Sequence, residues 1–313
     1  MTSKTPSLEL PDLTGRRALL TGGSDGIGLG IATRLAAAGA DLLLPVRNPA
    51  KGASAVEVIR RTAPGARVEL HRLDLSSLSS IADFAELLLD RGDPIHVMIN
   101  NAGVMTPPTR QVTADGIELQ FGTNHLGHFA LVGRLLPLLR AGSARVTSQI
   151  SIAANQGAIN WDDLNWERSY NGMRAYSQSK IAFGLFGREL DRRSRAEGWG
   201  ISSNLAHPGV APTSLLAARP ELGRDRPSPA RRFIGALSRR GILFGTAESA
   251  GLPALLAATA PDAGGKLFGP SGVQHLGGAP GEQRLFSRLT GEADATRIWD
   301  VSAGLADVGF MVR

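Results

Sequence analysis

The stretch Thr21-Gly22-Gly23-Ser24-Asp25-Gly26-Ile27-Gly28 joins a short apolar run to a longer helical pattern near the start of the chain. Its glycines follow the spacing G-x-x-x-G-x-G and stand where a strand is expected to turn into a helix. Glycines allow a tight turn and the close approach of a pyrophosphate, and the helix N-terminus supplies free N–H donors. The stretch therefore predicts a nucleotide-binding turn, with a glycine-rich turn that binds nothing as the alternative.

Short apolar runs alternate with longer helical stretches on both sides of this turn. The expected strands are Ala18–Leu20, Asp41–Val46, Arg67–Leu70, Ile95–Ile99, Arg145–Thr147, Ile201–Leu205 and Lys266–Phe268. The expected helices are Ile27–Ala38, Ala50–Thr62, Leu78–Leu89, Leu119–Leu139, Ala175–Ala196 and Thr246–Ala260. Strands that bury both faces need helices on each side of a parallel sheet. The pattern predicts an α/β protein with one doubly wound parallel sheet in three layers.

The composition excludes several classes of protein. The 313 residues are 42% hydrophobic and 20% charged, which is enough for a large core and excludes a disordered chain. The cysteine count of 0 excludes a disulfide framework, a thiolate metal site and a cysteine nucleophile. We find no signal-peptide pattern and no transmembrane run of ~18 apolar residues. We therefore expect a cytoplasmic protein.

The net charge of +6 arises from 34 Lys and Arg residues against 28 Asp and Glu residues. A basic balance is compatible with nucleic-acid or membrane partners. Aromatic residues make up only 5% of the chain, and a single one, Phe233, falls within the one local basic cluster, Arg231–Arg240. We therefore expect no nucleic-acid partner.

Further motifs follow the glycine turn in a fixed order. They are Asp74-Leu75, Asn100-Asn101-Ala102-Gly103, Asn124, Ser151, the Y-x-x-x-K pair Tyr176 and Lys180, and His207-Pro208-Gly209. Over roughly residues 14–275 the chain resembles the short-chain dehydrogenase/reductase family. Thr123–Phe129 and the 25-residue separation of Ser151 and Tyr176 resemble its retinol-dehydrogenase-like branch. The resemblance implies a Rossmann-type fold, which we expect as a single domain over residues 1–313.

The residue after the second strand bears on the choice of nicotinamide cofactor. NAD sites place a carboxylate there, whereas an arginine accommodates the 2′-phosphate of NADP. Here the strand ends Leu44-Pro45-Val46-Arg47-Asn48, and the planar guanidinium of Arg47 suits a phosphate. We expect NADP(H), with a solvated loop arginine as the alternative. The carboxylate of Asp25 would repel a phosphate, and the hydroxyl of Ser24 would offset this.

The resemblance implies the remaining cofactor contacts. Asp74 would bond the adenine edge, with a helix N-cap as the alternative, and Asn101 to Gly103 would line the adenosine ribose. Thr213 would touch the nicotinamide end. The expected cofactor-binding residues are Gly22, Ser24, Asp25, Gly26, Ile27, Gly28, Arg47, Asp74, Leu75, Asn101, Ala102, Gly103, Tyr176, Lys180, Pro208, Gly209 and Thr213.

Tyr176 and Lys180 are four residues apart, which places them on one face of a helix. We expect the Lys180 ammonium to lower the pKa of Tyr176, so that the phenol exchanges a proton with an alcohol or carbonyl. By resemblance, Ser151 would donate to the substrate oxygen. Ser148 is its rival, because Ile150 stands where the family has the first of two serines.

Asn124 is a poor helix former in the middle of a predicted helix. Its side chain would hold a water that relays protons to Lys180, or it is a core amide satisfied by backbone. His125, His128 and His207 have no acidic or cysteine neighbours at ligand spacing. We expect no metal site, and we interpret the first two as packing residues and the third as a loop residue.

The proline-rich segment 211–245 corresponds to the family's variable substrate lid. Within it, Phe233, Ile234 and Leu237 have helical spacing in a basic stretch. This fits a lid over an apolar substrate, a peripheral membrane contact or an ordinary surface helix. Residues 269–313 form a glycine-rich C-terminal extension to which the pattern assigns no role.

We expect an NADP-dependent oxidoreductase that transfers a hydride between the nicotinamide and an apolar alcohol or carbonyl substrate. One alternative is a non-catalytic NADP-binding sensor on the same fold. Another is a C=C double-bond reductase, although the similar enzymes of that kind use cysteines, which this chain lacks. Relatives often form dimers or tetramers through the helix of the Tyr–Lys pair, so a homo-oligomer is compatible with the sequence.

Overall fold

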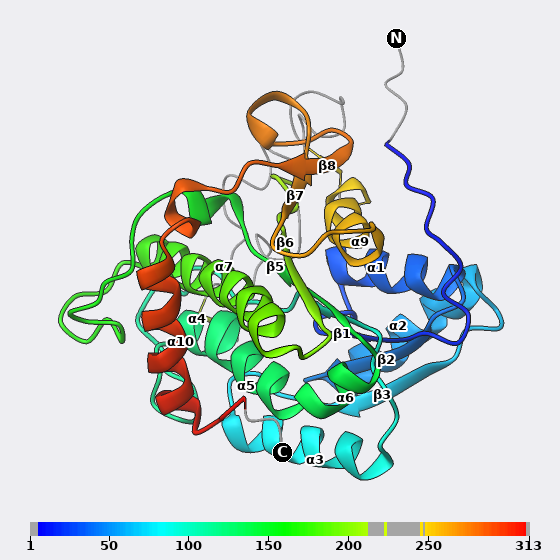
Figure 1. Cartoon of the computed structure of the whole chain (residues 1–313), viewed down its shortest axis with the longest axis horizontal. Helices are drawn as coiled ribbons and strands as arrows, with labels where there is room; N and C mark the ends of the chain where they lie inside the picture. Colours follow the sequence, from blue (N-terminus) through cyan, green and yellow to red (C-terminus); the bar gives the residue numbers. More distant parts are fainter. Residues whose placement is uncertain (1–5, 212–221, 224–244, 247, 311–313) are drawn as a thin grey trace.

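The computed structural model describes residues 6–211, 222–223, 245–246 and 248–310. In this part of the chain, eight strands form one sheet in the order β3-β2-β1-β4-β5-β6-β7-β8 (Figure 1). Neighbouring strands are parallel except for β7 and β8, which pair antiparallel. The chain moves outward from β1 to β3, returns to β4 beside β1, and then moves outward in the other direction. The predicted doubly wound sheet and single domain are confirmed.

Strands and helices alternate through most of the chain. The strands are β1 (Arg17–Leu20), β2 (Asp41–Val46), β3 (Val68–Arg72), β4 (Val97–Asn100), β5 (Arg145–Gln149), β6 (Ser202–Ala206), β7 (Leu267–Pro270) and β8 (Pro280–Gln283). The α-helices are α1 (Gly26–Ala37), α2 (Pro49–Thr62), α3 (Leu78–Arg91), α4 (Leu119–Phe121), α5 (Gly127–Arg134), α6 (Leu136–Ala141), α7 (Gly172–Glu197), α9 (Leu252–Thr259) and α10 (Glu292–Ala306). A π-helical turn, η1 (Gly122–Leu126), and the 3-10 turns η2 (Ile152–Asn155), η5 (Ser249–Gly251), η6 (Val273–His275) and η7 (Ser287–Leu289) complete them.

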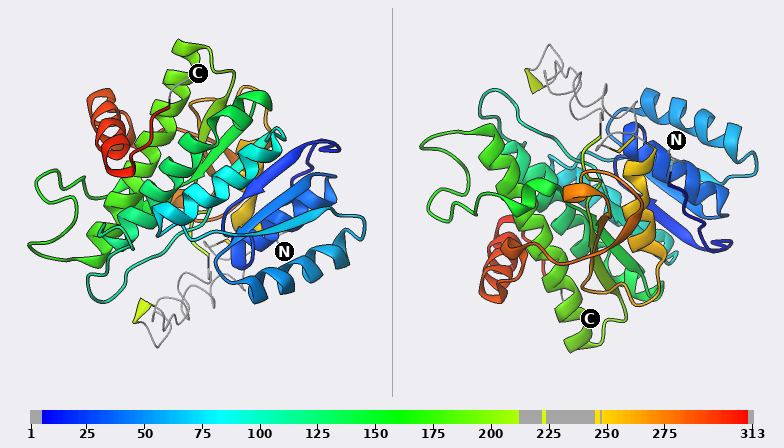
Figure 2. Two further views of the ribbon diagram at one scale, coloured as in Figure 1. Left: turned by 90° about the horizontal axis from the view of Figure 1, so that it is seen from below. Right: turned by 90° about the horizontal axis from the view of Figure 1, so that it is seen from above.

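Two apolar cores lie on opposite faces of the sheet (Figure 1 and Figure 2). α1, α2 and α9 cover one face, where Ile31, Ile59 and Leu255 are fully buried. α3, α5 and α7 cover the other face, with Phe129 and Phe186 in the core. Because both faces are covered, the parallel strands can be apolar along their whole length.

α10 packs outside this second layer, against α7 and α5 (Figure 1). Its Trp299 is 4% exposed, and the indole lies 5.3 Å from the ring of Phe129 and 4.3 Å from that of Phe310, measured between centroids. The C-terminal extension therefore contributes to the core, and through β8 it also adds a strand at the edge of the sheet.

The helix predicted over Leu119–Leu139 is wrong as one element, because α4, η1, α5 and α6 replace it. The backbone there approaches the β3–α3 turn so closely that a Cβ at Gly127 would lie 2.3 Å from the carbonyl oxygen of Leu75. Pro137, in the first turn of α6, has no N–H to continue a preceding helix. The other predicted strands and helices up to β6 are confirmed, with small shifts at their ends.

The helix predicted over Thr246–Ala260 begins later than expected. Thr246 does act as a start signal, since its Oγ1 accepts a hydrogen bond from the Ser249 N–H at 3.0 Å. The segment then continues as η5 and α9, and Pro253 occupies the first turn of α9. The regular helix is therefore Leu252–Thr259.

The predicted lid, residues 211–245, lies almost wholly outside the described residues, and so do Thr213, Phe233, Ile234 and Leu237. Across the residues that the structure does describe, no helix combines the length and the apolar character needed to cross a membrane.

Candidate active site

The turn between β1 and α1 requires glycine at two positions. Gly22 has a φ of +69°, and a Cβ there would lie 2.9 Å from both Ala102 Cα and Asn101 Nδ2. A Cβ at Gly28 would lie 2.0 Å from the carbonyl oxygen of Gly22. Side chains at these positions would force the turn open, so the glycines are what keeps it tight.

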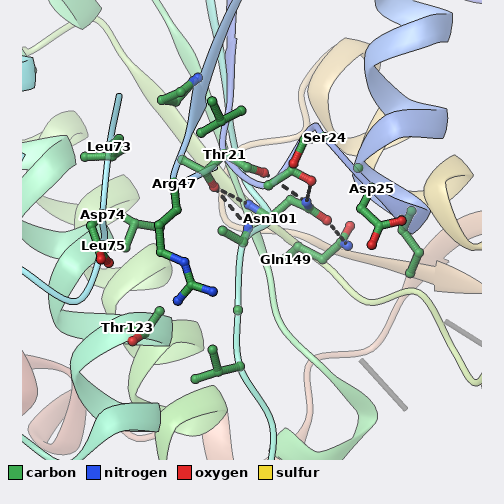
Figure 3. A pocket seen from close by; sticks show the side chains of 18 of the residues that line it. Thr21, Ser24, Asp25, Arg47, Leu73, Asp74, Leu75, Asn101, Thr123 and Gln149 are labelled. Carbon is green, nitrogen blue, oxygen red and sulfur yellow. Dashed lines mark hydrogen bonds between the residues drawn. The ribbon is translucent and has the colours of Figure 1, made fainter. Parts of the chain in front are cut away.

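Asp25 is the N-cap of α1. Its carboxylate accepts a hydrogen bond from the Gly26 N–H at 2.7 Å, and its backbone is extended. A carboxylate at this position also interacts favourably with the helix dipole. Figure 3 shows Asp25 on the opposite side of the glycine turn from Arg47. The Asp25 carboxylate, which we expected to repel a phosphate, thus serves as the N-cap of α1.

A cavity of about 1080 Å³ opens at the carboxyl ends of the central strands (Figure 3). In sheets of this topology, ligands bind where the strand order reverses, which here is between β1 and β4. The predicted site residues that line the cavity are Gly22, Ser24, Asp25, Ile27, Gly28, Arg47, Asp74, Leu75, Asn101, Ala102, Gly103, Ser151, Tyr176, Lys180 and Pro208. The structure therefore brings together segments that are far apart in the sequence.

Other predicted site residues are not part of the cavity wall. Gly26 is the first residue of α1, behind the turn. Gly209 has a φ of +68° and packs on the η6 loop, where a Cβ would lie 2.5 Å from the Leu276 carbonyl oxygen. Asn124 lies behind Gly103, since a Cβ at Gly103 would be 3.0 Å from Asn124 Oδ1. These residues shape the wall without lining it.

Asn101 ties the glycine turn to two other strand ends. Its Nδ2 donates to the carbonyl oxygens of Thr21 at 2.9 Å and Gly22 at 3.3 Å. Its Oδ1 accepts from Gln149 Nε2 at 2.7 Å, as the dashed lines in Figure 3 show. The ends of β1, β4 and β5 are therefore held together by one side chain. Gln149 was not identified from the sequence, because nothing in an apolar strand pattern shows which residue will face a neighbouring strand end.

Basic groups gather at the end of β2. Arg47 follows the strand, and Figure 3 shows its side chain directed into the cavity. Asn48 caps the 14-residue helix α2 by accepting from the Lys51 N–H at 3.1 Å, and both residues also line the cavity. A helix N-terminus beside two cationic side chains stabilises an anionic group. Asn48 and Lys51 were not predicted as site residues, although an Asn before Pro49 is a helix-start signal.

Asp74 is not the N-cap of α3. The cap is Ser77, whose Oγ accepts from the Ser80 N–H at 3.2 Å. The Asp74 carboxylate instead accepts from the N–H and Oγ of Ser76, at 2.9 and 2.6 Å. These bonds hold the carboxylate in one orientation at the cavity wall, beside Leu75.

Tyr176 is 5% exposed, and the side chain of Ser151 lies near its phenol in the cavity wall. Burial raises the pKa of Tyr176, and the neighbouring Ser151 side chain only partly opposes this effect. Our expectation that Lys180 lowers this pKa is therefore wrong, because removing a phenolate from water dominates its environment. The phenol is protonated at neutral pH and is able to donate.

Lys180 is held by the end of β5. Its ammonium donates to the carbonyl oxygen of Gln149 at 3.0 Å and lies 5.5 Å from the ring centroid of Phe183. Burial lowers the pKa of Lys180 to about 8. Gln149 stands two residues before Ser151, so one strand end orients both the ammonium and the serine hydroxyl.

Of the two rival serines, Ser151 lines the cavity and Ser148 does not. Ser148 is fully buried in β5 and faces α7, where a Cβ at Gly187 would lie 3.3 Å from its Oγ. Ser151 lies just past the strand, and its Oγ accepts from the Ala153 N–H at 3.2 Å. Only Ser151 is therefore placed to meet a substrate beside Tyr176.

Asn124 is fully buried in the π-helical turn η1. Its Oδ1 accepts from the Val104 N–H at 2.8 Å. Its Nδ2 donates to the Val104 carbonyl oxygen at 3.0 Å and to Ser179 Oγ at 2.9 Å. The side chain thus matches the alternative of a core amide, because its oxygen and its nitrogen are both engaged within the protein.

Among the residues that the structure describes, no three His, Cys, Asp or Glu side chains come together as metal ligands would. His207 is fully buried, and its Nδ1 accepts from the Gly209 N–H at 3.2 Å. Its Nε2 therefore carries the hydrogen and donates to Gln283 Oε1 at 2.8 Å. His207 therefore holds the loop after β6 against β8, whereas we expected a loop residue without such contacts.

The cavity has the features that a dinucleotide requires. A glycine turn whose Cβ positions are filled by backbone leads into a helix N-terminus, which suits a pyrophosphate. Basic groups lie at the end of β2, and Ser151, Tyr176 and Lys180 line the cavity just after β5 and on α7.

Comparison with known proteins agrees with this geometry. The family model for short chain dehydrogenase matches residues 16–222. Retinol dehydrogenase 13 of Homo sapiens is 37% identical over 302 residues, which cover 94% of this chain and 85% of that protein. Polyprenol dehydrogenase of Mus musculus is 35% identical over 306 residues, which cover 95% and 88%.

Solved structures show the same relationship. An uncharacterized protein from Mycobacterium Paratuberculosis is 32% identical with a TM-score of 0.78, and the match covers 98% of this chain and 100% of that one. The Pseudomonas aeruginosa RhlG/NADP active-site complex is 25% identical with a TM-score of 0.61, covering 82% and 94%. The chain therefore belongs to the short-chain dehydrogenase family of oxidoreductases, on its retinol-dehydrogenase-like branch.

Proposed function

We propose that this protein is an NADP(H)-dependent oxidoreductase that interconverts an apolar alcohol and its carbonyl. One observation carries the proposal: Ser151, the buried phenol of Tyr176 and Lys180, one helical turn after Tyr176, line the same cavity. When bound, the nicotinamide cofactor supplies or accepts the hydride. The protein's own side chains hold the substrate oxygen and move its proton.

Tyr176 is the proton donor for carbonyl reduction, because its raised pKa keeps the phenol protonated at neutral pH. Ser151 lies near this phenol in the cavity wall, so that both hydroxyls can donate to one substrate oxygen. In the direction of alcohol oxidation the phenol must first lose its proton. Burial opposes that loss, because it raises the pKa of the phenol.

The preference for NADP(H) rests on the basic end of the cavity. Arg47, Lys51 and the N-terminus of α2 offer donors and positive charge where a 2′-phosphate would lie. An NAD site would place a carboxylate after β2, and Arg47 stands there instead. NADP is also bound in two similar structures, RhlG and a metagenomic short-chain oxidoreductase.

An apolar substrate is supported by the relatives and by the wall near Tyr176. The similar proteins include dehydrogenases named for retinol and polyprenol, which are apolar alcohols. Val104 and Ile150 line the cavity beside the reacting side chains. We propose that residues 211–245, most of which lie outside the described chain, form the substrate lid.

The test is turnover of the purified protein with NADPH and NADH against a panel of aldehydes and ketones. The panel includes all-trans-retinal, an isoprenoid aldehyde and a short polar aldehyde. We expect reduction with NADPH, with the apolar aldehydes as the better substrates. Tight NADPH binding without turnover of any carbonyl would favour the sensor, and reduction of a double bond with the carbonyl retained would favour the C=C reductase.

A further inference from the structure

His128 is fully buried between the end of β1 and the π-helical turn, and the proposed chemistry does not use it. One ring nitrogen, Nε2, lies 2.9 Å from Thr21 Oγ1. The other, Nδ1, lies 3.0 Å from the carbonyl oxygen of Asn124. The ring stacks on Phe183 with the two centroids 5.0 Å apart. The imidazole therefore connects the residue that opens the glycine turn with η1.

The directions of these hydrogen bonds follow from the available donors. Thr21 Oγ1 accepts from the N–H of Asn101 at 2.9 Å and from the N–H of Ala102 at 3.0 Å. Both of its lone pairs are then used, so its own hydrogen is donated to His128 Nε2. A nitrogen that accepts carries no hydrogen. The hydrogen of the neutral ring is therefore on Nδ1, which donates to the carbonyl of Asn124.

Each end of the imidazole leads to a different half of the site. Through Thr21 it supports the backbone amides of Asn101 and Ala102, which follow β4 and line the cavity. Through Asn124 it reaches η1, whose Asn124 side chain bonds Val104 in the cavity wall and Ser179 on α7. Ser179 immediately precedes Lys180. One buried ring thus joins the dinucleotide turn to the helix that carries the reacting residues.

We propose that His128 is a positioning residue, which couples the glycine turn to the π-helical turn as a neutral imidazole with its hydrogen on Nδ1. A doubly protonated ring could not accept from Thr21, and it would carry positive charge in the same core as the Lys180 ammonium. Burial and that ammonium keep the pKa of His128 low, at about 3. The consequence for cofactor affinity rests on the proposed function, whereas the hydrogen-bond geometry does not.

The first experiment needs no cofactor. Nitrogen-15 NMR of the histidine rings is expected to show His128 neutral, with Nδ1 protonated and Nε2 bare. Asparagine can place an amide near Nδ1 but cannot reach Thr21, so His128→Asn leaves the Thr21 hydroxyl without its acceptor. We expect amide hydrogen exchange at Asn101 and Ala102 to become about tenfold faster, as loss of one buried hydrogen bond implies.

The second experiment separates affinity from turnover. His128→Asn and Thr21→Val both break the bond at the glycine turn, so each is expected to raise the NADPH dissociation constant about tenfold. Thr21→Ser keeps the hydroxyl and is expected to restore wild-type affinity. His128→Gln places an acceptor near Thr21 but loses the donor to Asn124. Its main effect is therefore expected on kcat, with NADPH affinity close to that of the wild type.

His125→Phe is the matched control. His125 is an equally buried ring in η1, but its hydrogen bond is to Ser302 of α10 and not to the glycine turn. This variant is expected to leave NADPH affinity and the exchange of the Asn101 amide unchanged. The proposal is overturned by a hydrogen on Nε2 of His128, or by His128→Asn exchange rates equal to wild type. A wild-type protein that binds no NADPH would instead defeat the proposed function and leave the NMR and exchange results to decide this one.

Discussion

Tyr176 is the residue on which the proposed chemistry depends most directly. Tyr176→Phe removes one oxygen and keeps the ring, so the fold and the cavity survive. General acid–base help is worth about 10²–10⁴-fold, and kcat for carbonyl reduction should fall by that factor. The NADPH dissociation constant, measured by fluorescence titration, should change little. Turnover at the wild-type rate would contradict the assignment, and Ser148→Ala serves as a control outside the cavity.

Arg47 carries the prediction about the cofactor. Arg47→Ala should weaken NADPH binding roughly tenfold to a hundredfold, as loss of a charge-assisted hydrogen bond implies, and should leave NADH binding nearly unchanged. Lys51→Ala should also weaken NADPH binding. Titration of both cofactors into each variant measures this. A wild-type protein that binds NADH more tightly than NADPH would refute the prediction.

At this scale the sequence predicted which residues gather at the cavity better than it predicted their protonation. Ser151 could be chosen over Ser148 from its separation from Tyr176, and the structure places it in the cavity. The direction of the Tyr176 pKa could not be predicted, because it depends on burial, which only the fold determines. Gln149 was missed because its contact with Asn101 exists only once β4 and β5 are paired.

Among the elements, the β1–α1 turn allows a test with a built-in control. A Cβ at Gly28 would lie 2.0 Å from the Gly22 carbonyl oxygen, whereas a Cβ at Gly30, in the same helix, would meet nothing within 4 Å. Gly28→Ala should lower stability by about 1–3 kcal/mol and abolish NADPH binding. Gly30→Ala should raise stability by about 0.5–1 kcal/mol and preserve binding. Thermal unfolding and cofactor titration check both, and equal behaviour of the two variants would refute the turn model.

Periodicity predicted most of the elements that bury apolar side chains over several turns, but it missed α10 in the C-terminal extension. It failed where tertiary contacts override propensity, as in the helix interrupted by η1 beside Leu75. Periodicity also failed to predict β8 (Pro280–Gln283), because this strand is short and its side chains are only partly buried. Strand pairing at a sheet edge leaves too little apolar pattern for such a segment to stand out.

For the whole molecule, buried histidines make stability depend on pH. Burial lowers the pKa of His125 and His128 to about 3 and that of His207 to about 4, below their ordinary value of 6.5. As pH falls below 6.5 the unfolded chain takes up protons that the folded chain refuses, so stability falls. At pH 5 each histidine lowers the free energy of unfolding by about 2 kcal/mol.

Urea unfolding of the wild type and of His125→Phe between pH 7 and 5 measures this. The variant should lose less stability on acidification, by about 2 kcal/mol at pH 5. Its new ring fits among Phe121, Phe129 and Phe186, and Ser302 keeps its bond to the Ile298 carbonyl oxygen. Parallel curves for the two proteins would show that His125 takes up protons equally in both states.

The position of β1 in the sheet has a consequence for synthesis. Of the described strands, β1 is made before the others, yet it lies between β2 and β4. α1, β2, α2, β3 and α3 precede β4 in the chain. A ribosome adds about 5–20 residues per second, so Leu19 and Leu20 wait several seconds for their second neighbour. During that interval the nascent chain exposes an apolar strand edge, which is the surface that a co-translational chaperone would bind.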